Sequence, residues 1–162
     1  MKRILLIADA TRARIFTYEQ HQAPDGPHEE LREEKDLVDS ERRKRASDLF
    51  SDSSGGNHNG PHGYSFDDHR KHHLEQLDAE FAAELAGAIE PIARERGYHN
   101  LLVVTSSRMI APLRAALEPL KRILTITELE RDYTKLATAE LRDHLAALDL
   151  LPPRPRLAFA DR

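Results

Sequence analysis

The chain has 162 residues, of which 40% are hydrophobic and 32% are charged, and its formal net charge is −4. This length and apolar content suit one hydrophobic core. The negative net charge argues against a globally basic binder of nucleic acids or anionic membranes, so any contact with phosphates must come from a local patch. The chain has no cysteine, which excludes disulfides and thiolate metal sites and favours an intracellular, cytoplasmic protein.

The N-terminal part is predicted to form three strands. Residues 3–8 are apolar after Arg3, but this run is too short for a signal peptide or for the ~20 apolar residues of a membrane span, so no membrane contact is expected. A second β-rich run covers residues 12–18 after a short turn at 9–11, and together the two runs predict a hairpin. After turn signals at 24–27, residues 28–38 alternate loosely and are predicted as an edge strand.

Residues 39–65 contain few apolar side chains and are predicted to form one long loop. A basic run lies near its start, and a stretch rich in Gly, Asn, Ser and His follows at 51–63. Loops of this length inside a compact domain are usually either functional or disordered. The residue types indicate that something is displayed there without identifying what is bound.

A long amphipathic helix is predicted after this loop. Its apolar side chains recur at steps of three and four residues: Leu74, Leu77, Phe81, Leu85, Ala88, Ile89 and Ile92. Ser65 and Asp68 are expected to cap its start, since their oxygens can accept hydrogen bonds from free backbone N–H groups. Gly97 suits its end, and Pro91 is expected to kink it.

The remaining elements alternate between strands and helices. Residues 101–105 read as a short buried strand, a helix follows to about Leu117, residues 123–129 alternate as another strand, and Thr138 opens a last helix. This order predicts an α/β fold with a mixed β-sheet and helices packed on it.

The chain is expected to be organised as a single domain. We assign residues 1–150 to the α/β domain, which includes the loop at 39–65, and residues 151–162 to a Pro-rich C-terminal extension. The prolines of the extension prevent it from continuing the last helix.

A basic run followed by glycines makes the loop a candidate nucleic-acid interface. Lys and Arg supply charge for phosphates, and glycines allow backbone N–H groups to approach them closely. The candidate residues are Arg42, Arg43, Lys44, Arg45, Gly55, Gly56, Asn57 and His58. The alternative is a solvated run balanced by nearby acidic residues, and no P-loop motif is present.

The histidines at the start of the long helix are a candidate metal site. His69 and His73 lie four residues apart and would share one side of a helix, with Asp68 as a further ligand. A metal-dependent enzyme would then use the His/Asp cluster at 58–73. Its cofactor would be a divalent metal, and the sequence indicates no other cofactor. The alternative is a solvated helix start, because no second fixed pair such as HExxH is present.

Two further positions have both a chemical and a structural interpretation. Asp9 ends the first strand, where a catalytic carboxylate can lie, with Asp36, Asp39 or Asp67 as companions around a divalent ion. An Asp in a tight turn also hydrogen-bonds its own backbone. Ser106 and Ser107, before Arg108, could bind an anion at a helix N-terminus, but capping explains them as well. These residues do not by themselves identify an enzyme, and no catalytic residue is assigned.

Short fragments spread along residues 3–148 carry a family resemblance. They are Ala8-Asp9 with Arg12-Ala13-Arg14-Ile15-Phe16, Asp48-Leu49-Phe50-Ser51-Asp52, Phe81-Ala82-Ala83-Glu84-Leu85, Arg108 to Arg114, and Asp132-Tyr133-Thr134-Lys135-Leu136 before Glu140-Leu141-Arg142. In this order they resemble the bacterial host-attachment-like proteins, which are described as required for attachment to host cells. That family is in turn similar to the middle domain of archaeal and eukaryotic peptide-chain release factors and of Pelota-like factors.

The resemblance implies a ribonuclease-H-like α/β fold and a function in translation. In release factors a Gly-Gly-Gln loop precedes a long helix and enters the ribosome, and Gly55-Gly56-Asn57 occupies the comparable place here. Asn is one methylene shorter than Gln, which lowers the expectation of hydrolysis. The resemblance therefore implies a non-enzymatic module that contacts ribosomal RNA or tRNA. The alternatives are a cell-surface adhesion factor, against which the absence of a signal peptide counts, and the metal-dependent enzyme; a protein partner is not identified.

Overall fold

The computed structural model describes residues 1–42, 44 and 63–155, and over residues 63–67 it describes the backbone alone. Its sheet has five strands in the order β3-β2-β1-β4-β5. The strands are β1 (Lys2–Ala8), β2 (Arg12–Ala23), β3 (Gly26–Val38), β4 (Asn100–Thr105) and β5 (Thr125–Glu130). β1, β2 and β3 are antiparallel neighbours, whereas β1, β4 and β5 run parallel. The sheet is therefore mixed, as predicted.

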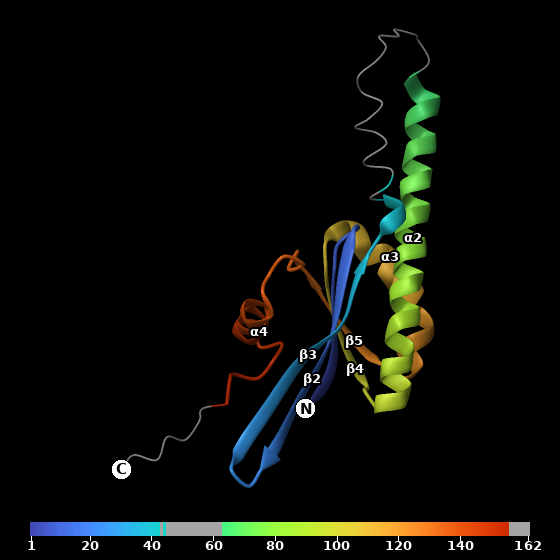
Figure 1. Ribbon diagram of the computed structural model, residues 1–162. Helices are drawn as coiled ribbons and strands as arrows, with labels where there is room; N and C mark the ends of the chain where they lie inside the picture. The colour runs from blue at the N-terminus through green and yellow to red at the C-terminus, as the bar shows by residue number, and fades with distance from the viewer. Residues whose placement is uncertain (43, 45–62, 156–162) are drawn as a thin grey trace.

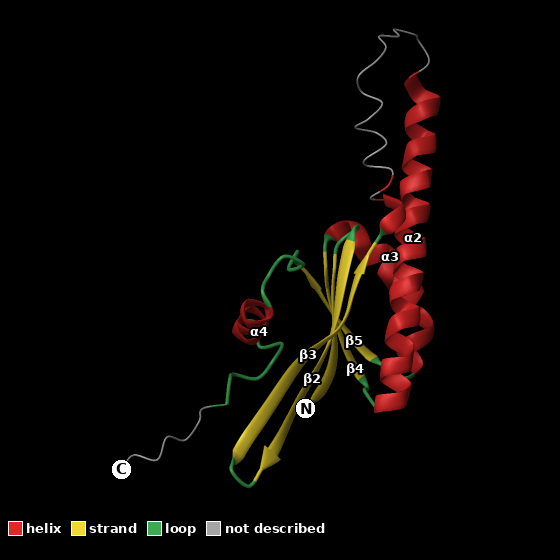
Figure 2. Cartoon of the chain, in the orientation of Figure 1, coloured by secondary structure: helices red, strands yellow, loops and turns green. Residues whose placement is uncertain are grey.

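Helices cover both faces of this sheet (Figures 1 and 2). They are α2 (Gly63–Arg96), α3 (Ser107–Leu117), the 3₁₀ helix η2 (Glu118–Arg122) and α4 (Thr138–Ala147). α2 and α3 lie together on one face and α4 lies on the other. The predicted α/β class with packed helices is confirmed. None of the helices in the described ranges is both long and apolar enough to cross a membrane.

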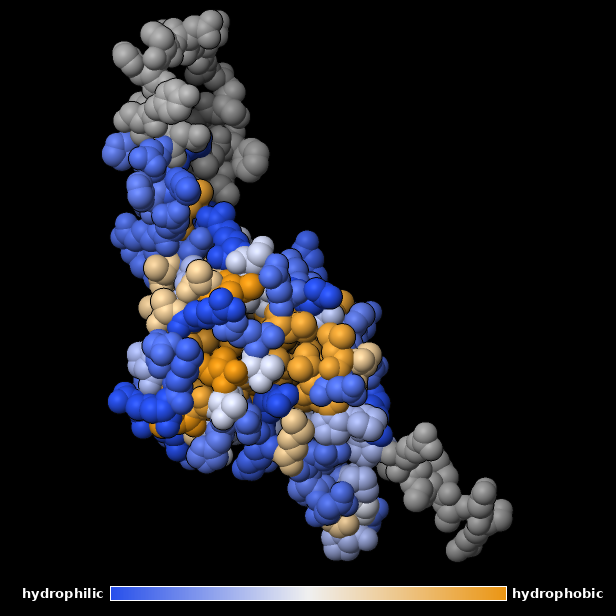
Figure 3. All heavy atoms as spheres, turned by 180° about the vertical axis from the view of Figure 1, so that it is seen from behind, coloured by the Kyte–Doolittle hydropathy of each residue, from blue (hydrophilic) through white to orange (hydrophobic). Residues whose placement is uncertain are grey.

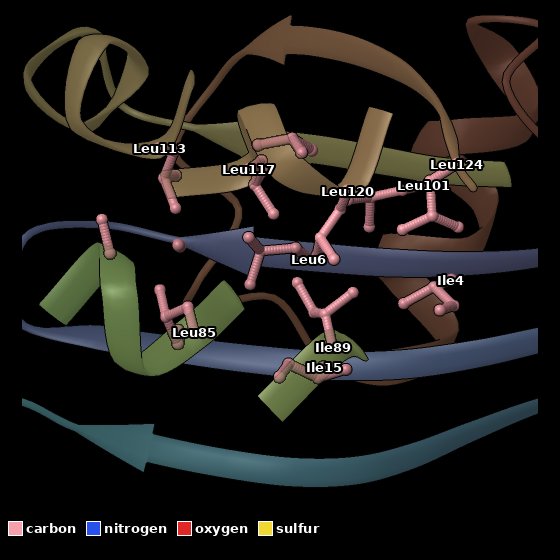
Figure 4. Close-up of a cluster of buried hydrophobic side chains, with 14 of the residues drawn as sticks. Ile4, Leu6, Ile15, Leu85, Ile89, Leu101, Leu113, Leu117, Leu120 and Leu124 are labelled. Carbon is pink, nitrogen blue, oxygen red and sulfur yellow. The ribbon is translucent and has the colours of Figure 1, made fainter. Parts of the chain in front are cut away.

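The central strand β1 supplies side chains to two hydrophobic clusters because alternate residues of a strand point to opposite faces. Ile4 and Leu6 join the cluster under α2 and α3, where Leu85, Ile89, Leu113 and Leu117 pack on them (Figure 4). Leu5 and Ile7 join the second cluster, which α4 covers with Leu141 and Leu145. This burial on both faces explains why residues 4–8 form a continuous apolar run.

The predicted N-terminal hairpin and edge strand are confirmed. β2 pairs along nearly its whole length with β3, and the register shifts between Ile15 and Phe16. β3 lies at the edge of the sheet and begins at Gly26, two residues before the predicted start. Gly26 has a φ of 125°, a conformation that glycine adopts readily and other residues do not, so the turn fixes where the strand begins.

The long helix is confirmed but starts earlier than predicted. Leu77, Phe81, Leu85 and Ile89 are buried, as the periodicity requires. Because α2 already begins at Gly63, Ser65 and Asp68 lie within the helix, and the prediction that they cap its start is wrong. The helix runs continuously past Pro91 and ends before Gly97, whose φ of 67° confirms the predicted stop.

Two boundary predictions are corrected by the structure. The predicted loop at 39–65 is wrong at both ends, because residues 40–42 are helical and residues 63–65 belong to α2, and most of the residues between lie outside the described ranges. The predicted strand at 123–129 runs instead from Thr125 to Glu130. There, η2 occupies the preceding residues, and the N–H of Leu124 donates to the carbonyl of Leu120 at 2.8 Å, which keeps the chain helical up to that point.

The first part of the C-terminal extension is docked onto the domain. Leu151 is buried in the cluster under α4. The Pro152 carbonyl accepts a 2.8 Å hydrogen bond from Nη2 of Arg142, and Nε of Arg154 donates to Asp143 at 2.7 Å. The extension therefore contributes to covering α4 before it reaches the residues that the structure does not describe.

Candidate nucleic-acid interface

The turn after β1 is built around the Asp9 carboxylate. Oδ1 accepts hydrogen bonds from the backbone N–H groups of Thr11 at 2.7 Å and Arg12 at 2.8 Å, and from the Thr11 hydroxyl at 2.9 Å. Oδ2 accepts from the Thr134 hydroxyl at 3.2 Å. Burial raises the pKa of Asp9, but these hydrogen bonds outweigh it and lower the pKa overall. The carboxylate is therefore a structural acceptor at the carboxyl end of β1.

This arrangement predicts a loss of stability in acid. Because the pKa of Asp9 is lower in the folded state, its contribution is fully present above the unfolded-state pKa of about 3.9 and is lost as the pH falls through the lower folded value. Asp9→Asn keeps one acceptor oxygen but does not titrate. We expect a shallower decline of the unfolding free energy below about pH 4 in this variant, measured by urea denaturation at several pH values. Parallel declines in the variant and the wild type would contradict this role.

Next to this turn, the chain leaves the sheet through Asp39 and Arg42. The N–H of Asp39 donates to the Thr11 carbonyl at 2.8 Å, and its side chain accepts from the N–H of Arg42 at 3.0 Å. Asp39 thus caps the short helical segment at 40–42. The guanidinium of Arg42 reaches back to the Ala10 carbonyl at 2.8 Å. The segment that precedes the candidate loop is therefore fastened to the turn after β1.

Arg42 also joins α2 and, through it, α3. Its Nη1 lies 2.7 Å from Oδ1 of Asp78, and these two side chains are only 11% and 5% exposed. Nε of Arg108, on α3, donates to the other Asp78 oxygen at 2.8 Å. We refer to Asp39, Arg42, Asp78 and Arg108 as the root cluster, because beyond it α2 continues past the sheet. One buried carboxylate thus holds two arginines from different elements.

Beyond the root cluster, the first half of α2 projects away from the sheet (Figure 1). Residues 63–76 of the helix correspond to ~21 Å at ~1.5 Å per residue. Leu74, predicted to lie on the apolar face, is 37% exposed here because the sheet no longer covers it. Four basic or titratable side chains on this half are exposed: His69, Arg70, Lys71 and His72. The projection therefore carries exposed basic side chains, with the acidic Asp68 and Glu75 exposed among them.

The candidate nucleic-acid residues fall into two groups. Arg42 is committed to the root cluster and is nearly buried, so it positions the segment and does not face solvent. Lys44 is exposed and lies 3.4 Å from Glu41. The other candidates lie outside the described residues: Arg43, Arg45, Gly55, Gly56, Asn57 and His58.

The candidate metal ligands are described in part. Asp68 lies 3.8 Å from His72, which also lies 3.7 Å from Glu75, so the acidic neighbours on this helix pair with His72. His69 is exposed and His73 is half-buried. Over the described ranges, no three His, Asp or Glu side chains gather as a metal site would require. His58 and His62 lie outside those ranges.

The other candidate positions have structural partners. Asp36, considered as a companion of Asp9, pairs with Nε of Arg12 at 2.9 Å. Ser106 occupies the N-cap position of α3, but its hydroxyl makes no capping hydrogen bond. Arg108, which was expected to add charge for an anion there, pairs with Asp78 instead. These contacts account for Asp36 and Arg108 without a ligand, whereas the capping role expected of the Ser106 hydroxyl is not observed.

Asp78 was missed by the sequence reasoning, although a signal was present. It lies four residues after Leu74 and three before Phe81, so it falls within the apolar stripe of the long helix. A carboxylate in a buried stripe requires a cationic partner. That requirement pointed to a buried ion pair, and the basic run at 42–45 was a source for its cation.

The fold and the projecting helix define a class of protein: an α/β domain with a mixed five-stranded sheet, from which one long helix projects. A family model described as "Protein required for attachment to host cells" matches residues 4–145. The chain belongs to this host-attachment family. A search of curated proteins found no match.

Proposed function

We propose that this host-attachment family member is a non-enzymatic binding module that contacts ribosomal RNA or tRNA through the basic segment and the projecting half of α2. The proposal extends the likeness to the middle domain of release factors and Pelota-like factors, with Gly55-Gly56-Asn57 in the place of the Gly-Gly-Gln loop. Asn57 in place of Gln is the reason to propose binding without hydrolysis. A ribonuclease-H-like fold is part of the same proposal, and the mixed sheet with helices on both faces supports it.

The observation that carries the proposal is the root cluster at the base of the projection. Arg42 is fixed to α2 through Asp78, so the chain enters the basic run from a defined point on the helix. The exposed Arg70 and Lys71 lie farther along the same helix. The proposal assigns the phosphate contacts to these basic side chains, because a protein whose net charge is −4 can bind phosphates only through a local patch.

Co-sedimentation with purified bacterial ribosomes tests the proposal. We expect the wild type to pellet with ribosomes at low salt and to be released as salt rises, because each phosphate contact releases counterions. The triple variant Arg43→Glu, Lys44→Glu and Arg45→Glu should stay in the supernatant. Arg42 is left unchanged because its replacement would break the root cluster.

A matched control separates local charge from net charge. Arg32→Glu, Arg94→Glu and Lys121→Glu change the net charge by the same amount at exposed positions on β3, the end of α2 and η2. This control should pellet like the wild type. The proposal is wrong if the wild type stays in the supernatant at low salt, or if both triple variants lose binding equally.

The family description supports a second candidate, a factor that acts at the cell surface during attachment. This function requires the protein to be accessible from outside the cell. Protease treatment of intact cells should then remove the protein while leaving a cytoplasmic marker intact. If the protease degrades neither the protein nor the marker, the protein is not exposed at the cell surface, and any role in attachment is indirect.

A further inference from the structure

The outer edge of β5 carries unpaired backbone groups. The N–H of Thr125 donates to the His99 carbonyl at 2.8 Å, and the N–H of Arg131 donates to the Thr105 carbonyl at 3.0 Å, so these residues face β4. Backbone groups of successive residues in a strand point to opposite sides. The N–H and C=O groups of Ile126, Glu128 and Glu130 therefore face outward, and within the described chain no strand pairs with them. The Glu130 carbonyl accepts a hydrogen bond from Nη1 of Arg131 at 2.9 Å, so Ile126 and Glu128 are the residues available for pairing.

Apolar side chains flank this edge on both faces of the sheet. Ile123 and Ile126 pack against the cluster under α2 and α3 but stay partly exposed. Leu129 does the same against the cluster under α4. Seen from behind, the middle of the molecule shows gathered apolar side chains (Figure 3). The edge thus combines backbone groups that no strand pairs with and partly exposed apolar side chains on both sides.

The opposite edge of the sheet is different. β3 carries a charged side chain at most positions between His28 and Asp36, including Glu30, Arg32 and Lys35, all of them exposed. Charged side chains along an edge strand discourage pairing with another chain. β5 has only two charged residues, Glu128 and Glu130, and Arg114 of α3 lies 2.6 Å from Glu128. The β5 edge is therefore the one that is suited to pairing.

We infer that β5 pairs antiparallel with β5 of a second copy across a two-fold axis, which joins the two sheets into one. The edge is self-complementary in one register, with Thr127 on the axis. Ile126 then lies opposite Glu128 of the second copy, and Thr125 lies opposite Leu129 of the second copy. Each copy supplies the N–H and C=O groups of Ile126 and Glu128 to the new ladder. A closed two-fold dimer is also the commonest form of homo-oligomer.

Charge and length select this register over its neighbours. Placing Glu128 on the axis would set it directly opposite the same residue of the second copy, and like charges in that position are unfavourable. Placing Ile126 on the axis would leave only Thr125, Ile126 and Thr127 paired within the strand. With Thr127 on the axis, five residues pair and no like charges face each other, and the two threonines form a favourable cross-strand pair.

Single cysteines test the register in a chain that has none of its own. Thr127 faces β4 with its backbone, so across the axis it forms a non-hydrogen-bonded pair, in which Cα atoms lie ~4.5 Å apart, within disulfide range. Thr127→Cys should form a covalent dimer on mild oxidation. Thr125→Cys, at another exposed position on the same strand, should not, because it faces Leu129 of the second copy.

Sedimentation equilibrium tests the dimer itself, starting with the full wild-type chain. We expect twice the 18.4 kDa of one chain at high micromolar concentration. Thr127→Lys and Thr127→Glu should each be monomeric while keeping the wild-type circular dichroism, and mixing the two should restore the dimer. A monomeric wild type, a dimer that survives Thr127→Lys, or equal cross-linking by both cysteine variants would overturn the inference. None of these outcomes depends on ribosome binding.

Discussion

Asp78→Asn should lower the free energy of unfolding by about 3–5 kcal/mol, the usual cost of removing one partner from a buried ion pair. The substitution keeps the size of the side chain but removes its charge. Arg42, whose side chain is 11% exposed, would then be left buried opposite a neutral amide. Urea denaturation followed by circular dichroism measures the change.

Arg108→Ala is the matched control for the same carboxylate. Arg108 lies 2.8 Å from Asp78, but its own side chain is 47% exposed, so its charge is largely solvated. We expect a loss of less than about 1 kcal/mol, as for other exposed ion pairs. If both variants lose the same free energy, the stabilisation does not come from the buried Arg42–Asp78 contact, and the root cluster does not fix the segment to α2.

Arg142→Met should lower the free energy of unfolding by about 3 kcal/mol, because it leaves a carboxylate without its cation. Arg142 is on α4 and only 3% exposed, and it donates from Nε and Nη2 to Glu29 of β3 at 2.9 and 2.6 Å. Arg142, more than any other group, lowers the pKa of Glu29. Burial, followed by the hydrogen bond to Glu29, raises the pKa of Tyr18 to about 12, so its hydroxyl stays a donor.

The double variant Glu29→Met, Arg142→Met tests the origin of that loss. Replacing both members of a buried ion pair with apolar residues is often neutral. The double variant should therefore recover most of the stability that Arg142→Met loses, as measured by the same urea titration. A double variant as unstable as the sum of the two single variants would show that the arginine contributes through its packing and its contact with the Pro152 carbonyl.

Most of the sheet could be predicted from the sequence because its signals are local. The run at 4–8 is apolar because both faces of β1 are covered, and Gly97 ends α2 because its positive φ suits glycine. The predicted start of α2 is wrong because Ser65 and Asp68 match the capping pattern in sequence, and the pattern alone does not show whether a helix begins there. The backbone instead continues the helix back to Gly63.

The candidate site was harder to predict because it depends on contacts between distant elements. The basic run was identified, but its first member, Arg42, pairs with Asp78 on α2 and not with a ligand. Arg14 and Arg142 are likewise buried, and they pair with Glu33 and Glu29. The sequence contains many acidic and basic residues that could pair with one another, and only the fold determines which of them lie close together.

The two neighbours of β1 in the sheet are synthesised at different times. β1 pairs on one side with β2, which follows at once, and on the other with β4, which is synthesised only after α2. When the β1–β2 hairpin has emerged from the ribosome and β4 has not, one edge of β1, the most apolar strand, is left unpaired. Such an edge readily pairs with other chains. Synthesis that pauses within α2 is therefore the stage at which this protein is most exposed to aggregation.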